Sequence, residues 1–292
     1  NNNSNTEKRK GQELYNNAKK IIPGGTQLLS KRPEMFLPNN WPAYYQYNSG
    51  IEITTLDGVK MKDFSIMGIG SCILGYCDPD VNRAVKISID KGNMSTLNSS
   101  NEVELTKILL ELHPWADMAR YCRGGGEADA IAVRIARAAS KKDKVAFCGY
   151  HGWHDWYLSA NWNSRDALGE HLLGGLSPEG VPKNLKDTAF PFKYNDYQGL
   201  LNIISCHDIG TIIMEPIRSE EPKDDFLYKI RNLCNEKNII LIFDEVSSGF
   251  RLNTGGIHLL YDIQPDIAIF AKAMGNGYPI GAIIGIKEIM SY

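Results

Sequence analysis

The stretch IILIFDEV, residues 239–246, decides the fold class of this chain. It is the most apolar strand candidate in the sequence, and it ends in two carboxylates, Asp244 and Glu245. Other short apolar runs share its character, namely KVAFC (144–148), TIIME (211–215) and DIAIFA (266–271). Continuous runs of Val, Ile, Leu and Phe are typical of strands that are buried on both faces of a parallel sheet.

Segments with apolar residues at helical spacing separate these strand candidates. The clearest are ADAIAVRIARAAS (128–140) and DFLYKIRNLCNEK (225–237). Two more helices are predicted over 81–92 and 101–112, the second with Asn101 as its N-cap. The alternation predicts an α/β fold with a mainly parallel sheet between helices. Ligands of such sheets bind beyond the carboxyl ends of the strands, so functional residues are expected there.

The first 75 residues have a different character. They contain the hairpin candidate GIEITTLDGVKMKDFS (50–65), with Asp57-Gly58 at its turn. We therefore predict a smaller α+β part over 1–75 and a large domain over 76–292.

The segment 151–200 is rich in Gly, Trp, His, Asn and Pro, which makes it a candidate active-site loop. Because the sequence stops shortly after the apolar run at 280–286, we expect a fragment whose natural chain continues.

The composition is that of a soluble globular enzyme, with 292 residues, 43% hydrophobic and 23% charged. The net charge of −2 gives no reason to expect nucleic acid or an acidic membrane as a partner. No apolar run approaches the roughly 20 residues that a membrane helix needs, and the start resembles no signal peptide. The six cysteines form no CxxC pair, so we expect reduced packing residues, no metal site and a cytoplasmic location.

Three glycines, in RGGGEA (123–128), lie between the strand candidate ARYCR (119–123) and a helix. Backbone N–H groups at such a helix start bind anions, most naturally a phosphate. The alternative is a tight turn that is merely rich in glycine. The motif is neither GxGxxG nor a Walker loop, since it lacks GK[ST], and this disfavours a nucleotide hydrolase.

Two further strand ends carry residues with more than one interpretation. The segment YHGWHDW (150–156) offers an aromatic ring that could stack on a planar ligand, although aromatic loops often serve packing alone. Asp244 and Glu245 could bind a metal, or hold a protonated heterocyclic nitrogen by a charge-assisted hydrogen bond. The alternative is a structural carboxylate that caps a loop, with Glu245 in a salt bridge.

Lys272 follows the strand candidate DIAIFA and precedes a glycine-rich turn. Burial lowers the pKa of a lysine, and a neutral amine can attack an aldehyde. The commoner alternative is a lysine that reaches solvent with its charged end.

Taken together, a phosphate loop, a stacking aromatic ring, a buried carboxylate and a nucleophilic lysine are what pyridoxal phosphate requires.

The motifs IFDEVSSGFR (242–251), AKAMGNGYPIGA (271–282), RGGGEADAIAVRIAR (123–137) and MEPIRSE (214–220) carry a resemblance. They resemble the class III pyridoxal-phosphate-dependent aminotransferases, close to glutamate-1-semialdehyde 2,1-aminomutase, and the likeness spans nearly the whole chain. The resemblance implies a fold-type I enzyme, pyridoxal 5'-phosphate as cofactor and a homodimer. The phosphate loop departs from the Ser-Gly-Thr that the family often has, since Gly124 and Gly126 replace the hydroxyl residues.

The resemblance also implies a set of cofactor contacts. Asp244 would bond the ring nitrogen, Tyr150 would stack on the ring, and Lys272 would bind the aldehyde as a Schiff base, the internal aldimine. These three are the predicted catalytic residues. The remaining predicted contacts line the phosphate and the ring: Gly125, Gly126, His151, Glu215 and Val246.

Two residues are predicted to bind substrate. Glu220 resembles a glutamate that pairs with a substrate-carboxylate arginine farther along the chain in some members. Ser30 lies in the segment 26–31, which departs from the aminomutase's Val-Asn-Ser-Pro. This departure favours an aminotransferase that moves an amino group between an amino donor and a small or sugar-like carbonyl compound. The alternatives are an intramolecular 2,1-aminomutase and a catalytically silent binding protein on the same fold.

Overall fold

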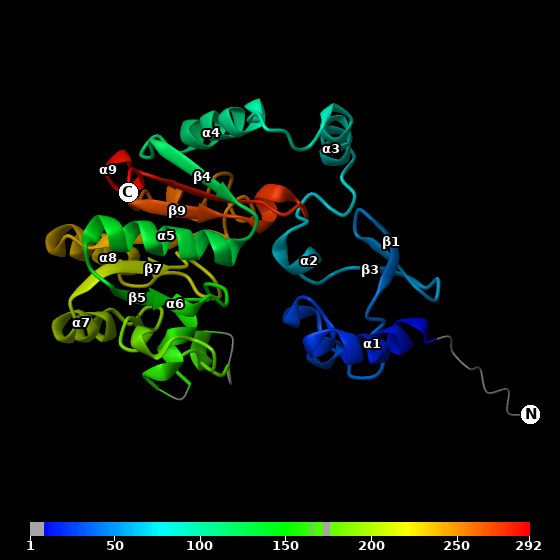
Figure 1. The fold of residues 1–292 in the computed structure, drawn as a ribbon, viewed down its shortest axis with the longest axis horizontal. Helices are drawn as coiled ribbons and strands as arrows, with labels where there is room; N and C mark the ends of the chain where they lie inside the picture. Colours follow the sequence, from blue (N-terminus) through cyan, green and yellow to red (C-terminus); the bar gives the residue numbers. More distant parts are fainter. Residues whose placement is uncertain (1–8, 165, 172–175) are drawn as a thin grey trace, which may run out of the picture. The chain divides into compact units, whose positions relative to one another are not determined.

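The computed structural model describes residues 9–164, 166–171 and 176–292 (Figure 1). The chain divides into two compact units between Asn93 and Met94, whereas the division predicted from the sequence lies at residue 75. The domain assignment stays a prediction, and each unit is described by itself. Within the described ranges, no helix has the length and apolar character needed to cross a membrane.

The first unit is built around a small antiparallel sheet. Its strands are β1 (Tyr45–Ser49), β2 (Glu52–Thr55) and β3 (Lys60–Lys62), and its helices are α1 (Lys10–Ile21), α2 (Met67–Gly70) and α3 (Pro79–Lys91). The predicted hairpin joins β2 to β3, which pair antiparallel. Gly58 has a φ of 80° at its turn, a conformation that glycine adopts without strain. The hairpin prediction is confirmed.

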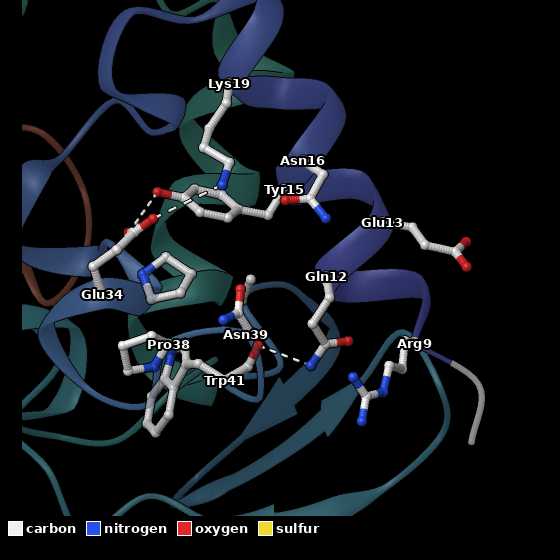
Figure 2. A pocket seen from close by; sticks show the side chains of 12 residues that line it. Arg9, Gln12, Glu13, Tyr15, Asn16, Lys19, Glu34, Pro38, Asn39 and Trp41 are labelled. Carbon is white, nitrogen blue, oxygen red and sulfur yellow. Dashed lines mark hydrogen bonds and ion pairs between the residues drawn. The ribbon is translucent and has the colours of Figure 1, made fainter. Parts of the chain in front are cut away.

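Side-chain hydrogen bonds attach helix α1 to the loop that follows it (Figure 2). The Tyr15 hydroxyl donates to Glu34 at 2.8 Å, and the Gln12 amide donates to the carbonyl of Trp41 at 2.9 Å. The helix and the loop enclose a pocket of about 290 Å³, which these side chains line together with Arg9 and Lys19. These contacts make α1 and the loop one packed element of the first unit.

The second unit holds a seven-stranded sheet in the order β4-β10-β9-β8-β7-β5-β6. The strands are β4 (Met118–Cys122), β5 (Lys144–Cys148), β6 (Ala189–Pro191), β7 (Ile209–Met214), β8 (Ile240–Asp244), β9 (Ile267–Phe270) and β10 (Gly281–Gly285). Neighbouring strands from β9 to β6 pair parallel, and β10 pairs antiparallel with β9 and with β4. The mainly parallel α/β prediction is confirmed, and β10 is the one described strand of this sheet that runs antiparallel to the others.

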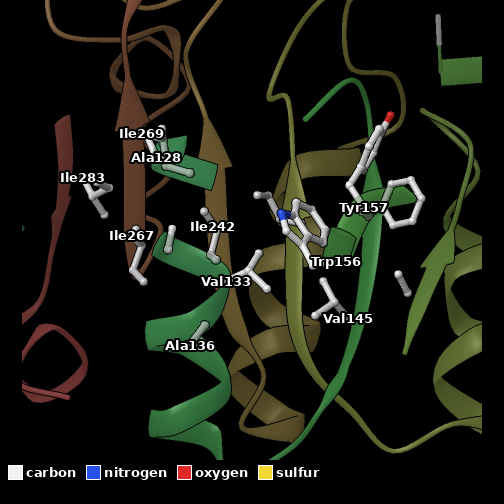
Figure 3. Close-up of a cluster of buried hydrophobic side chains, with 14 of the residues drawn as sticks. Ala128, Val133, Ala136, Val145, Trp156, Tyr157, Ile242, Ile267, Ile269 and Ile283 are labelled. Atoms are coloured by element: carbon white, nitrogen blue, oxygen red, sulfur yellow. The ribbon is translucent and has the colours of Figure 1, made fainter. Parts of the chain in front are cut away.

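Helices cover both faces of this sheet. Helix α5 (Gly125–Ser140) packs on one face, and α4 (Ser100–Leu112), α7 (Tyr197–Cys206) and α8 (Phe226–Lys237) pack on the other. Successive strand residues divide accordingly: Val145 and Phe147 belong to the cluster under α5, and Ala146 belongs to the cluster under α7 and α8. Figure 3 shows the α5 cluster, in which helix alanines lie against strand isoleucines. Burial on both faces explains the continuous apolar runs.

Two sequence predictions about local structure need correction. Helix α4 begins after Ser99, whose hydroxyl accepts the Asn101 N–H at 3.3 Å, so Asn101 lies inside the helix and is not its N-cap. The predicted loop 151–200 contains regular structure: α6 (Asp155–Leu158), β6 and α7. Strand β6 is only three residues long, which is too short for a periodicity to be read from the sequence.

Candidate active site

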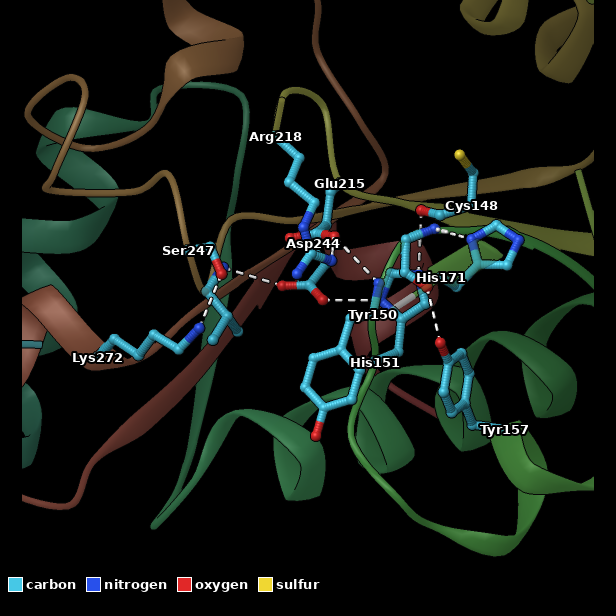
Figure 4. A network of polar contacts seen from close by, with 12 residues as sticks. Cys148, Tyr150, His151, Tyr157, His171, Glu215, Arg218, Asp244, Ser247 and Lys272 are labelled. Atoms are coloured by element: carbon cyan, nitrogen blue, oxygen red, sulfur yellow. Dashed lines mark hydrogen bonds and ion pairs between the residues drawn. The ribbon is translucent and has the colours of Figure 1, made fainter. Parts of the chain in front are cut away.

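The carboxyl ends of the parallel strands meet at one edge of the sheet, and functional side chains gather there (Figure 4). Tyr150 follows β5, Glu215 follows β7 and Lys272 follows β9. Contacts connect these ends: the Tyr150 N–H donates to Glu215 Oε2 at 3.0 Å, and Lys272 Nζ donates to Ser247 Oγ at 2.8 Å. The structure therefore brings the ends of β5 and β7 together and places the Lys272 amine beside Ser247.

Asp244 ends strand β8 and is only 2% exposed. Its Oδ2 lies 2.7 Å from Nδ1 of His151, and its Oδ1 accepts the Val246 N–H at 2.9 Å. The other ring nitrogen of His151 lies 3.2 Å from the carbonyl oxygen of Cys148. A buried carboxylate is costly unless it is paired, and both oxygens of Asp244 have partners. Each oxygen has a second lone pair, so Asp244 can accept a further hydrogen bond.

Glu245, the next residue, has a different role. Its Oε2 accepts from the Ser248 hydroxyl at 2.6 Å and from the Ile257 N–H at 3.0 Å. Its Oε1 lies 2.9 Å from both the backbone nitrogen and the ring Nδ1 of His258. Three of these four contacts go to Ile257 and His258, so Glu245 is a structural carboxylate that holds residues 257–258 in place.

Lys272 is half-buried, and its backbone has a φ of 43°, in the left-handed region that non-glycine residues seldom adopt. Burial lowers the pKa of its amine, and the nearby Arg218 and Arg251 act in the same direction, whereas Asp244 and Glu215 oppose them. A lowered pKa increases the fraction of neutral, nucleophilic amine. Ser247, whose hydroxyl accepts a hydrogen bond from this amine, is a residue of the site that no sequence motif predicted.

Arg218 is a second residue that sequence reasoning missed. Its Nη1 lies 2.7 Å from Oε2 of Glu215, and its side chain is 32% exposed. Burial and the charge of Asp244 raise the pKa of Glu215, and Arg218 opposes the rise. The signal in the sequence is a cationic side chain three residues after Glu215.

The glycine-rich loop brings backbone close to the same edge. A side chain at Gly125 would place its Cβ 2.7 Å from Cγ1 of Val246, whereas a Cβ at Gly124 would meet no described atom within 4 Å. Among the described residues, no side chain caps the start of helix α5. The first N–H groups of a helix lack intrahelical partners. The loop thus packs against Val246 at Gly125. The backbone N–H groups at the start of helix α5 lie next to the open space beside Gly124.

Helix α5 adds a third overlooked residue, Asp129. It is 2% exposed, and one of its oxygens lies within 4.8 Å of side-chain atoms of His151 and Asp244. The signal in the sequence is a carboxylate on the apolar side of the helix, four positions before the buried Val133.

The two predicted substrate residues lie in different units of the chain. Glu220 lies on an exposed segment after β7, where its Oε2 is 3.2 Å from Nζ of Lys223. Ser30 is exposed in the short helical turn Leu29–Lys31 of the first unit. The roles of both residues stay predictions.

Residues 38–292 match the family described as aminotransferase class-III. The chain is 34% identical over 286 residues to the 3-aminobutyryl-CoA aminotransferase of Cloacimonas acidaminovorans, covering 95% of this chain and 64% of the relative. It is 37% identical over 284 residues to the glutamate-1-semialdehyde 2,1-aminomutase of Campylobacter hominis, covering 94% of this chain and 61% of the relative.

A solved structure described as a transaminase with PLP bound superposes with a TM-score of 0.83 at 26% identity. The superposition covers 96% of this chain and 65% of that chain. The chain thus spans under two thirds of the length of each of these three proteins.

Proposed function

Because this chain belongs to the class-III aminotransferase family, for which pyridoxal phosphate is the typical cofactor, we propose that it forms the cofactor-binding part of an aminotransferase. The reaction moves an amino group between an amino donor and a small or sugar-like carbonyl compound. The observation that carries this proposal is the Lys272 amine, whose pKa is lowered by burial, at the same sheet edge as the Asp244–His151 pair.

The residues present fit this cofactor. The space beside Gly124 and the uncapped helix start at Gly125 suit a phosphate group, because backbone N–H groups at a helix start bind anions. Asp244 has spare acceptor capacity for a ring N–H. Val246 is held by its own N–H bond to Asp244, which keeps its apolar side chain beside the carboxylate.

Each of these side chains has a defined task in the proposed reaction. When bound, pyridoxal phosphate supplies an electron sink for the electrons left on the substrate Cα. Asp244 would hold the proton at the ring nitrogen, and His151 would keep the Asp244 carboxylate oriented through the 2.7 Å contact. Lys272 Nζ would bind the aldehyde and, once released, would take the proton from Cα. The Ser247 hydroxyl would orient that nitrogen.

An intramolecular aminomutase reaction is the second candidate. The Campylobacter hominis relative, named glutamate-1-semialdehyde 2,1-aminomutase, is 37% identical to this chain. Such an enzyme needs the same proton transfers at Lys272, so the sheet edge alone does not separate the two reactions. The segment 26–31, which departs from the aminomutase motif, favours the transfer between two molecules.

Covalent capture of the cofactor tests the assignment of Lys272. The chain is mixed with pyridoxal phosphate, reduced with borohydride and digested, and the peptides are mapped by mass spectrometry. We expect label at Lys272 in the wild type, none there in Lys272→Ala, and unchanged labelling at Lys272 in the control Lys183→Ala, which alters an exposed lysine. Label spread over surface lysines, with Lys272 unlabelled, would contradict the proposal.

A substrate panel separates the two reactions. The loaded protein is mixed with amino donors one at a time, and the absorbance change that accompanies amination of the cofactor is recorded. Release of a free keto product and amination of an added carbonyl compound support an aminotransferase. Conversion of glutamate-1-semialdehyde without an added partner supports the aminomutase. We also propose a homodimer, which sedimentation of the loaded protein would test.

A further inference from the structure

Asp129 is a buried acid that the proposed reaction does not yet use. It lies on the sheet-facing side of helix α5, where its neighbours Ala128, Ala132 and Val133 belong to the hydrophobic cluster. Its side chain lies close to those of Asp244 and His151: one carboxylate oxygen from each acid and one ring nitrogen of His151 all lie within 4.8 Å of one another. Two carboxyl groups at this separation in an apolar interior cannot both carry a charge without a large energetic cost.

The hydrogen bonds indicate which of the two acids is charged. Both oxygens of Asp244 accept hydrogen bonds, from Val246 and at the His151 ring. Oδ1 of Asp129 has no hydrogen-bond partner in the part of the chain that the structure describes. An oxygen without a donor costs far more on a buried carboxylate than on a neutral acid. The negative charge therefore belongs on Asp244 and the proton on Asp129.

The surrounding charges agree with this assignment. The described groups that face Asp129 come from four strand ends: Asp244 at the end of β8, Glu215 after β7, Lys272 after β9, and Tyr150 with His151 after β5. Burial raises the pKa of Asp129 well above its usual value, and Asp244 and Glu215 raise it further. Among the described groups that contribute most to this shift, only the Lys272 amine lowers the pKa of Asp129.

We propose that Asp129 is a neutral carboxylic acid that donates a hydrogen bond to the Asp244 carboxylate, and that it acts as a positioning residue for the ring-nitrogen site. The proposal deepens the proposed function and rests on it for its catalytic meaning. A donated hydrogen bond stabilises the charge on Asp244 and makes Asp244 a weaker base. A proton between Asp244 and a bound ring nitrogen would then stay on the nitrogen, where it is needed.

The first test needs no cofactor. Infrared difference spectra of wild type minus Asp129→Asn should show the C=O band of a protonated carboxyl at neutral pH. Asp143→Asn, which alters an exposed carboxylate just after helix α5, is the matched control and should not remove this band. Asn has nearly the volume of Asp and keeps a donor, so the variant retains the packing. Absence of the band at neutral pH would overturn the proposal.

The pH dependence of stability gives a second readout on the same variants. Below about pH 4, Asp129 is protonated in both the folded and the unfolded chain. Above that pH the unfolded chain loses the proton and the folded chain keeps it, so the contribution of Asp129 to the free energy of unfolding falls with rising pH. We expect the denaturation midpoint of Asp129→Asn to rise relative to wild type between about pH 4 and 7, with Asp143→Asn tracking the wild type. If the difference in midpoint between Asp129→Asn and the wild type did not change with pH, this would count against a neutral Asp129.

Cofactor binding then tests the positioning role separately. Asp129→Leu removes the donor, so its affinity for pyridoxal phosphate should fall about tenfold, and the pH at which the bound cofactor changes its absorption should move. Asp129→Asn should keep the affinity near that of the wild type. Equal affinities and equal absorption titrations in all three proteins would overturn the positioning role. If none of the three proteins binds cofactor while the wild type shows the infrared band, the neutral Asp129 is supported and the proposed function fails.

Discussion

Asp244 and Glu245 are adjacent, yet their side chains bind different parts of the protein. Asp244 pairs with His151 at the sheet edge, and Glu245 holds the loop at 257–258. The sequence placed both at the end of the most apolar strand, and it left open which one was structural. The hydrogen bonds separate them, because all four contacts of Glu245 go to nearby loop residues.

Replacing Asp244 by Asn keeps the shape of the side chain but removes its charge. A charge-assisted hydrogen bond contributes about 1.5–3 kcal/mol, so we expect cofactor to bind and the rate of amination to fall by about 10- to 150-fold. Single-turnover absorbance measurements with the best donor would check this. An Asn variant that kept the full rate would show that Asp244 does not hold the ring proton.

Replacing Glu245 by Gln should act on stability. The change leaves buried donors of the 257–258 loop poorly paired, and we expect a loss of about 1–3 kcal/mol in the free energy of unfolding. Urea unfolding compared with the exposed Glu236→Gln control would measure it. A loss no larger than that of the control would mean that the loop does not depend on Glu245.

At the scale of elements, the loop between β4 and α5 depends on how closely it approaches Val246. The Cβ of Gly125→Ala would lie 2.7 Å from that side chain, whereas the Cβ of Gly124→Ala meets no described atom within 4 Å. Because overpacking of this kind costs about 1–3 kcal/mol, Gly125→Ala should be the less stable variant. Thermal unfolding of both would test this, and adding Val246→Ala should restore part of the loss.

The N-terminus of helix α4 offers a similar comparison. Ser99→Ala removes the hydroxyl that accepts the Asn101 N–H, and loss of an N-cap costs about 1 kcal/mol. Asn101→Ala changes an exposed residue inside the helix and should cost much less. Urea unfolding of the two variants would distinguish them, and the reverse order would restore Asn101 as the N-cap.

At the scale of the whole molecule, the two compact units should respond separately to a core substitution. Ile213 is fully buried in strand β7 of the second unit. Truncating a buried Ile to Ala costs about 2–5 kcal/mol, so Ile213→Ala should lower amide hydrogen-exchange protection throughout the sheet of that unit. Protection of the β2–β3 hairpin in the first unit should change little. Equal losses in both units would show that the two unfold as one.

The sequence alone determined the α/β class, the strands β5, β7, β8 and β9, and the gathering of Tyr150, Asp244 and Lys272 at one edge. It could do so because burial on both faces requires continuous apolar runs, and because parallel strands bring their carboxyl ends to the same side. Local patterns were sufficient for these features.

Only the tertiary structure decided which side chains meet across that edge. The antiparallel pairing of β10 with β4, the Ser247 contact of Lys272 and the burial of Asp129 depend on partners far away in the sequence. A side chain's charge state follows from its distances to other groups and from its removal from water. Neither quantity can be read from a local stretch: the sequence marks Asp129 only as a carboxylate on the apolar side of a helix, and the fold places it beside Asp244.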